Sequence, residues 1–326
     1  MMTCTIRWLF STKSRSSTFA AVLLLSWASI STAKAATVTV STTCTFAKAV
    51  LTLNSRSNQV PCTHSGTFGV SDTVVVPNGT FNIASPVAIT RSMTIHGGGK
   101  TTAYLQNTYP YSAATIHITN PNITVKMDNL TLTSNLPNDC TGILVEGADD
   151  TNLSDNNLEL SYVVISNFGE SGMVNVGGRV LMQYSLVYLN VGVFGGGVEN
   201  TVGQNSNGSL AGASFIAKYS AISENQATGN GGGIFNAGHM DLRSTVLQDN
   251  TTTGQGGAIW VNGDLSNASC NVTRDVPSAA PSEIDDNVAD QGFGIIASGV
   301  SCSLNDTIGS GNSSPYCTST VFNCPQ

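Results

Sequence analysis

The alternation of apolar and polar positions in this chain is organised around a repeat of 25 residues between Tyr219 and Asp264. Residues 222–225 return as 247–250, and residues 228–235 return as 253–260. A repeat of this length is typical of stacked supersecondary units, none of which buries its own apolar face alone.

Each repeat has an apolar residue three positions before an asparagine, and a glycine seven positions after it. The clean copies contain Asn225 with Gly232 and Asn250 with Gly257. Further copies are Asn190 with Gly197, Asn287 with Gly294 and, more weakly, Asn135 with Gly142, whereas Asn167 is followed by Val174 in place of the glycine.

Short β-branched runs separated by Gly and Asn favour strands and tight turns over helices. One repeat per coil, with asparagine at a constant corner, predicts an all-β fold: a single-stranded, right-handed parallel β-helix. We expect nine to eleven coils between Gly66 and Gly309, and an asparagine ladder in which Asn225 and Asn250 occupy the same corner of adjacent coils. The glycines are expected to supply turns with positive φ.

The N-terminal 35 residues have the features of an export signal. A basic segment with Arg7, Lys13 and Arg15 precedes an apolar run at 19–30, which is short for a membrane span. Residues 33–35 (Ala-Lys-Ala) fit a cleavage site, so the mature chain is expected to begin at Ala36; an uncleaved N-terminal anchor is the alternative. No other apolar stretch approaches membrane length.

Removal of this segment changes the charge balance. It carries four basic residues and no acidic one, which leaves nine Lys and Arg against 20 Asp and Glu, a net charge of about −11. A surface of this sign, with no basic run, disfavours nucleic acid and anionic membranes as partners. We expect one elongated, monomeric domain.

Seven cysteines remain after residue 35, and an oxidising compartment favours disulfides. We predict Cys44–Cys62 at the N-terminal end, Cys270–Cys302 between an insertion and the next coil, and Cys317–Cys324 in a C-terminal loop, with Cys140 unpaired. A metal site is the competing interpretation, but the chain has no Cys-x-x-Cys pair and only four His.

Residues 43–53 predict a short helix capped by Thr43, because Phe46, Val50 and Leu53 recur at helical spacing. Such a helix would cover the open end of the β-helix. The predicted organisation is an export signal (1–35), an N-terminal cap (36–65), a parallel β-helix (66–310) and a C-terminal cap or tail (311–326).

The order of residues 44–50, Cys62, residues 72–81 and residues 94–99 resembles the N-terminal half of exported pectin-lyase-like parallel β-helix proteins. The Gly-Gly-apolar repeats with an upstream asparagine are similar to the repeat of polymorphic outer-membrane (chlamydial-type autotransporter) adhesins. Together the resemblances cover most of residues 44–300. They imply the fold and leave the function open, because this fold hosts lyases, hydrolases, epimerases, tailspikes and adhesins.

The residue before the corner asparagine is acidic in three repeats. Glu224, Asp249 and Asp286 are expected to project from equivalent corners, and Asp285 precedes the last of them. If an insertion buries them, such carboxylates raise one another's pKa, bind a cation such as Ca²⁺, or serve a retaining glycosidase. An acidic stripe in open solvent is the alternative, and we expect that open edge.

Two further segments contain candidate chemistry. His239 and Arg243 lie near Asp241, and pectin hydrolases use His and Arg near acids, but only Gly238-His239 matches their signature; a surface loop is the alternative. Asp149, Asp150 and Asp155 lie in an Asn- and Asp-rich insertion that is a candidate Ca²⁺ loop, with Arg179 as the only nearby cationic group, as pectate lyases require; a solvated insertion is the alternative.

Phe235 and Trp260 lie one repeat apart and form either a sugar platform or a packed ladder. With no cofactor motif, phosphate loop or nucleophilic triad, the sequence favours a secreted, non-catalytic β-helix that binds an extracellular polysaccharide or cell-surface glycan. A polysaccharide lyase or glycoside hydrolase is the alternative.

Overall fold

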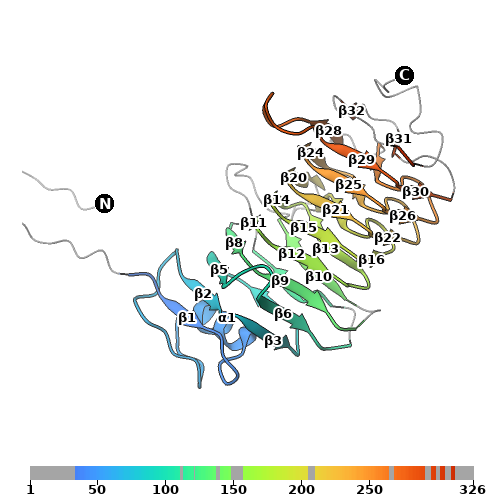
Figure 1. Ribbon diagram of the computed structural model, residues 1–326. Coiled ribbons are helices and arrows are strands. Elements are labelled where there is room, and N and C mark those ends of the chain that lie inside the picture. The colour runs from blue at the N-terminus through green and yellow to red at the C-terminus, as the bar shows by residue number, and fades with distance from the viewer. Residues whose placement is uncertain are drawn as a thin grey trace, which may run out of the picture. The chain divides into compact units, whose positions relative to one another are not determined.

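Three long parallel sheets wind around one apolar core in the computed structural model (Figure 1). The structure describes residues 34–110, 113–120, 122–136, 140–147, 157–204, 210–263, 268–290, 295–298, 302–304 and 310–312. Residues 34–326 group as a single unit. The predicted export signal therefore lies almost wholly outside the described residues, as does most of the predicted C-terminal tail.

Sheet 1 has ten strands: β1 (Thr37–Thr39), β2 (Thr73–Val76), β5 (Met93–Gly97), β8 (Val125–Asp128), β11 (Leu158–Ser161), β14 (Arg179–Gln183), β20 (Ser214–Lys218), β24 (His239–Arg243), β28 (Ser269–Thr273) and β32 (Cys302–Leu304). Sheet 2 has eight: β3 (Gly79–Ile83), β6 (Ala103–Asn107), β9 (Thr131–Ser134), β12 (Val164–Ser166), β15 (Leu186–Tyr188), β21 (Ala221–Ser223), β25 (Val246–Gln248) and β29 (Glu283–Asp285).

Sheet 3 also has eight strands: β4 (Val87–Ile89), β7 (Ile116–Ile118), β10 (Thr141–Glu146), β13 (Ser171–Val176), β17 (Val198–Thr201), β23 (Ile234–Asn236), β27 (Ile259–Asn262) and β31 (Ile295–Ser298). Sheet 4 is short: β16 (Val191–Gly192), β22 (Gln226–Ala227), β26 (Thr251–Thr252) and β30 (Val288–Ala289). An insertion forms the antiparallel pair β18 (Gly203–Gln204) and β19 (Leu210–Ala211).

Each coil runs from sheet 1 to sheet 2, through sheet 4 in the later coils, to sheet 3 and back, so the predicted parallel β-helix is confirmed. Sheet 3 has one strand per coil, and its eight described strands mark eight coils, after which β32 begins another. Sheet 1 has nine described strands between Gly66 and Gly309, from β2 to β32, so the described residues reach the lower end of the expected nine to eleven coils.

The interior is built by strand alternation, which turns every second side chain inward. In β5, Met93 and Ile95 are 2% and 0% exposed, while His96 between Ile95 and Gly97 points to solvent. The inward side chains of all three long sheets belong to one continuous hydrophobic cluster.

The predicted asparagine ladder is confirmed at the corner after sheet 2. Asn225 Nδ2 donates to Asn250 Oδ1 at 3.0 Å, and the Asn225 backbone N–H donates to the same oxygen at 3.1 Å. The ladder runs through five fully or nearly fully buried residues: Asn190, Asn225, Asn250, Asn287 and Asn312. Register within the repeat is therefore as predicted, and the ladder continues one member further, to Asn312.

The two weak copies of the repeat lie outside this ladder. Asn135 and Asn167 are exposed, and Asn167 Nδ2 bonds instead to Thr133 Oγ1 at 3.2 Å. Phe168 takes the equivalent place, because its backbone N–H donates to Asn190 Oδ1 at 3.1 Å and its ring is buried. An apolar residue thus replaces the ladder asparagine in the coil that precedes Asn190.

The repeat glycine was expected to supply a turn with positive φ, and this prediction was wrong for Gly232. Gly232 does not have a positive φ; the preceding Gly231 does, at 74°. A Cβ on Gly232 would lie 2.5 Å from the carbonyl oxygens of both Gly257 and Thr251 in the next coil. Gly232 is therefore required by the close approach of two coil backbones.

A second ladder, not predicted from the sequence, lies at the corner between sheets 3 and 1. Asn175 Nδ2 donates to Asn200 Oδ1 at 2.8 Å, and Asn200 Nδ2 donates to Asn236 Oδ1 at 2.6 Å. All three side chains are fully buried. This corner lacked the regular Asn-to-Gly spacing that identified the first ladder.

The N-terminal end is covered by the helix α1 (Phe46–Ser55). Its cap is Thr45 and not Thr43, because Thr45 has extended backbone angles and its hydroxyl accepts from Lys48 N. The apolar face of α1, including Phe46 and Leu53, packs into the core. Within the predicted cap segment (36–65), β1 pairs with β2 and so joins sheet 1.

Two of the predicted disulfides, Cys44–Cys62 and Cys270–Cys302, are confirmed, and Cys140 is a buried free thiol. The predicted Cys317–Cys324 pair lies outside the described residues. Where the structure describes the chain, no helix has the length and apolar character needed to cross a membrane.

Candidate functional site

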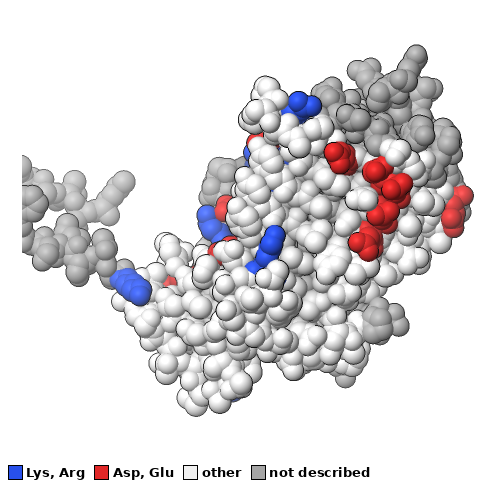
Figure 2. Space-filling model, in the orientation of Figure 1, with Lys and Arg blue, Asp and Glu red and all other residues white. Residues whose placement is uncertain are grey.

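The three predicted corner carboxylates, Glu224, Asp249 and Asp286, form an acidic column along one edge of the β-helix. Each immediately precedes a ladder asparagine and has a positive φ, of 53°, 54° and 48° respectively. All three side chains are exposed, and Figure 2 shows acidic side chains gathered over the later coils. The equivalence of these corners is as predicted.

The acidic column is open over the part of the chain that the structure describes. Its three residues take part in none of the ion pairs found there. The open edge was the expected outcome, and the described parts of two insertions that could have covered it, within 204–213 and 267–278, lie elsewhere: β18 and β19 pack beside Gly177, and Asp275 reaches sheet 1. Water and salt screen such exposed charges, so the column by itself supplies no chemistry.

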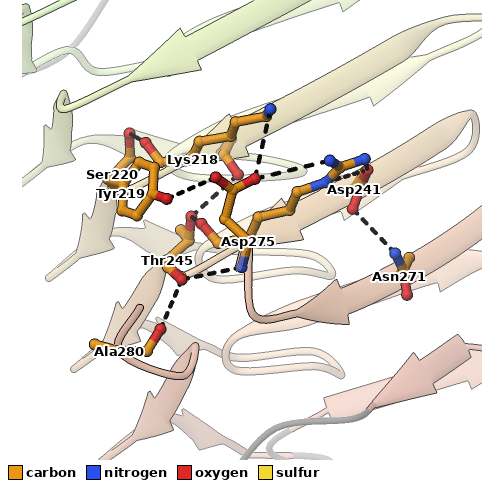
Figure 3. A network of polar contacts seen from close by, with 11 residues as sticks. Lys218, Tyr219, Ser220, Asp241, Thr245, Asn271, Asp275 and Ala280 are labelled. Carbon is orange, nitrogen blue, oxygen red and sulfur yellow. Dashed lines mark hydrogen bonds and ion pairs between the residues drawn. The ribbon is translucent and has the colours of Figure 1, made fainter. Parts of the chain in front are cut away.

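A network of polar contacts instead joins the later coils on sheet 1 (Figure 3). Asp275, in the segment after β28, accepts from the Tyr219 hydroxyl at 2.6 Å and lies 3.5 Å from Lys218 Nζ and 3.8 Å from Arg243 Nη1. Arg243 also donates to Asp241, whose other oxygen accepts from Asn271 at 3.1 Å. One loop is thereby held to two earlier coils.

This network does not provide an acid–base pair, because its charges neutralise one another. The Tyr219 hydroxyl, Lys218 and Arg243 hold the pKa of Asp275 below its usual range. The hydrogen bond to Asp241 is the largest cause of the raised pKa of Arg243. A carboxylate kept ionised in this way is a poor proton donor at neutral pH.

The segment 238–243 is a strand and not the surface loop considered as the alternative. Along β24, His239, Asp241 and Arg243 point to the same face. The imidazole Nδ1 of His239 lies 2.7 Å from Ser269 Oγ in the next coil, whereas Asp241 and Arg243 bond to each other. The structure therefore does not bring the three side chains into one catalytic group.

Asp149, Asp150 and Asp155 lie outside the described residues, so the candidate Ca²⁺ loop stays a prediction. Arg179 lies in β14, and its Nε has no hydrogen-bond partner among the described residues. Within those residues, no three His, Cys, Asp or Glu side chains gather closely enough to hold a metal ion.

The outer face of sheet 3 carries a different arrangement, in a row that crosses six coils. Strand register places one outward residue per coil side by side. We call these residues the sheet-3 row: His117, Leu144, Val174, Glu199, Phe235 and Trp260. The first three line a cavity of about 390 Å³ together with Glu170 and apolar side chains.

Glu199 is the functional candidate that sequence reasoning missed. It lies between Val174 and Phe235, and burial raises its pKa above the usual glutamate value of 4.5. The signal was present in the repeat, since Gly197-Val198-Glu199 aligns with Gly233-Ile234-Phe235. A carboxyl group that replaces an aromatic ring in a packed row is a departure from the pattern.

Phe235 and Trp260 form a ladder. Their ring centroids are 4.8 Å apart with an interplanar angle of 26°, and Phe194 packs against Phe235 at 5.2 Å and 52°. Because the rings of Phe235 and Trp260 stack on each other, one face of each is unavailable to a sugar. Phe194, at 41% exposure, is the most open ring of the three.

No family model and no curated protein matches this chain. Among solved structures, it is similar to a protein described as ORF18 of Geobacillus virus E2, with 12% sequence identity and a TM-score of 0.31. The match covers 78% of this chain and 52% of that one, so this chain spans about half the length of the viral protein. A similarity this low says nothing about the activity of this chain.

Proposed function

We propose that this chain is an exported, non-catalytic binding protein that holds an extracellular polysaccharide or cell-surface glycan on sheet 3. The observation that carries the proposal is the sheet-3 row, in which apolar and aromatic side chains flank the partly buried Glu199 beside a cavity of about 390 Å³. Binding sites for small ligands and sugars combine such apolar surface with a few polar groups.

The chemistry of the row favours a neutral glycan. Apolar side chains such as Leu144 and Val174 pack against the C–H surface of a sugar ring, and the Glu199 carboxyl group exchanges hydrogen bonds with its hydroxyls. An acidic glycan would meet a chain with 20 acidic and 13 basic residues, whose charge repels it. The row follows the stacking direction of the coils, so an extended polysaccharide fits better than a compact ligand.

A panel of immobilised glycans, followed by calorimetric titration of the best one, tests this proposal. We expect Glu199→Gln and Leu144→Ser each to weaken binding by about tenfold, as removal of a central contact does. Val288→Ser is the matched control, because Val288 is an apolar residue that is 43% exposed and lies in β30 of sheet 4. Retention of no glycan, or equal binding by all variants, would contradict the proposal.

A carbohydrate-active enzyme is the second candidate, and the raised pKa of Glu199 is the observation that favours it. A general acid in glycoside hydrolysis needs a carboxyl group that stays protonated near working pH. If the chain releases new reducing ends from a polysaccharide and Glu199→Gln abolishes this release, the enzyme proposal would replace the binding proposal. The same assay with Asp249→Asn tests the acidic column, and we expect no role for it.

A further inference from the structure

The residue that follows the predicted cleavage point lies against a buried carboxylate. The backbone N–H of Ala36 donates to Asp72 Oδ1 at 3.1 Å, and Gly69 N donates to the same oxygen at 2.8 Å. Ala36 and Asp72 are 0% and 1% exposed. Two peptide N–H groups therefore hold this carboxylate in the protein interior.

Asp72 has no basic partner among the described residues. It takes part in none of the ion pairs among the described residues, and Arg91, the basic side chain bound nearby, donates to the Gly69 carbonyl oxygen at 3.1 Å. A buried carboxylate without a counter-charge is costly, and a cation at hydrogen-bond distance offsets that cost. The nitrogen of Ala36 already lies at that distance.

We propose that removal of residues 1–35 turns the Ala36 nitrogen into an α-ammonium group that pairs with Asp72. The proposal rests on the proposed export of the chain. An export peptidase adds water across the Ala35–Ala36 bond: the Ala35 carbonyl carbon takes the hydroxyl group and the Ala36 nitrogen takes the hydrogen. The new amine then binds a proton from solvent, since its usual pKa is about 7.7–8.0.

The contacts that position Ala36 survive the cleavage. Its carbonyl oxygen accepts from Thr73 N at 2.8 Å, and Thr37 exchanges two backbone hydrogen bonds with Ser65, at 2.8 and 3.0 Å. Of the described residues, Lys34 and Ala35 are removed by cleavage, and with them the bond from Thr67 N to the Lys34 carbonyl oxygen. The processed chain thus keeps its first strand in place and gains a charge opposite Asp72.

The ion pair couples maturation to the stability of the first coil. Pairing raises the pKa of the ammonium group above its value in the unfolded chain. The added stability is therefore fully present below about pH 7.7 and is lost as the pH rises through the raised pKa. Before cleavage this contribution is missing.

N-terminal sequencing of the exported protein is the first test, and the expected first residue is Ala36. The second test compares the chain that begins at Ala36, released from a fusion by a protease that leaves no extra residue, with its Nα-acetylated form and with a form extended by one glycine. At pH 6 we expect both modified forms to have an unfolding equilibrium constant about tenfold larger, which corresponds to a one-unit rise in the ammonium pKa.

The same three forms made with Asp72→Asn are the control, because this substitution removes the negative charge that the ammonium group would pair with. There the free, acetylated and extended forms are expected to unfold alike, because the amide carries no charge. If Asp72→Asn fails to fold, the pH dependence of cyanate modification of the Ala36 amine gives the same answer in the native chain. Equal stability of the three native forms, an unshifted amine pKa, or a first residue other than Ala36 would overturn the proposal. Failure at the second test alone leaves the glycan proposal intact.

Discussion

Asp249 and Asn250 are neighbours in the chain, yet they belong to two columns with opposite properties. Asn250 is fully buried and its side chain bonds to the coils on both sides, while Asp249 is exposed and outside every ion pair among the described residues. The inner column must repeat the same amide in each coil, because each one completes its neighbour's hydrogen bonds. The outer column changes from Leu189 to Glu224 without disturbing the coil.

This difference separates the residues that hold the fold together from the residues that are available for the proposed binding. The regular copies in the repeat are the inward residues that hold coil to coil. Outward residues are free to differ, so a departure at an outward position indicates function more strongly than the repeat itself does. Glu199, in the place occupied by Phe235 one coil later, is such a departure.

Breaking the inner column is expected to have the largest effect. Asn250→Ala removes the acceptor of two donors of Asn225 and leaves the Ile222 carbonyl oxygen without its side-chain donor. Unsatisfied buried groups cost about 1–3 kcal/mol each, and we expect the free energy of unfolding to fall by about 2–4 kcal/mol. Urea unfolding of the chain from residue 36 measures it; a loss below about 1 kcal/mol would show that water replaces the ladder.

The sequence predicted this ladder because its hydrogen bonds require one residue type at one spacing. The sequence pattern is absent where another interaction holds the corner. At Phe168 a buried ring occupies the place of the ladder asparagine. The ladder of Asn175, Asn200 and Asn236 lacks the glycine at a regular spacing that identified the first ladder. Helix α1 was expected from its apolar spacing, whereas its cap was misplaced by two residues because Thr43 and Thr45 are equivalent in a sequence pattern.

A methyl group between two coils is expected to have the next largest effect. Gly232→Ala places a Cβ within 2.5 Å of two carbonyl oxygens of the next coil, which must move apart. Overpacking of this kind costs about 1–3 kcal/mol. Gly212→Ala is the matched control, because a Cβ there meets no atom within 4 Å. Equal denaturation midpoints for the two variants would contradict the close approach of the coils.

Glu199→Gln tests an outward residue in place of the inner column. Its expected effect on the free energy of unfolding is smaller and depends on pH. Burial raises the pKa of Glu199, so the folded state binds a proton more tightly than the unfolded state, and the native chain loses stability as the pH rises from below 4.5 through that raised pKa. The amide does not titrate. We expect the variant to be more stable than the native chain at pH 7 and equal to it at pH 4.

Thermal unfolding at these two pH values measures the difference, and Val174→Thr, an uncharged substitution in the sheet-3 row, controls for general changes of that surface. A Glu199→Gln variant that is less stable at pH 7 would mean that the carboxylate has a partner in the folded chain.

Only one end of the sheet-3 row was predictable: Phe235 and Trp260 lie one repeat apart, and Glu199 has the same place after a Gly-apolar pair. The other members come from coils separated by insertions of different length, so their alignment depends on strand register and not on spacing in the sequence. The acidic column was predictable because each of its members is anchored to a ladder asparagine one residue away.

The smallest effect is expected where the acidic column is neutralised. Asp249 and Glu224 occupy the same corner in adjacent coils, about 4.8 Å apart along the stack, and both side chains reach into water. Their repulsion is weak in a high dielectric and is screened by salt. We therefore expect the Asp249→Asn, Glu224→Gln double variant to change the free energy of unfolding by less than about 0.5 kcal/mol, the usual range for surface substitutions. The change should be a slight gain at low salt that vanishes at high salt, with glycan binding unaltered. A clear loss of stability would mean that the column holds a cation, and the contrast between Asp249 and Asn250 would then be one between two kinds of structural site.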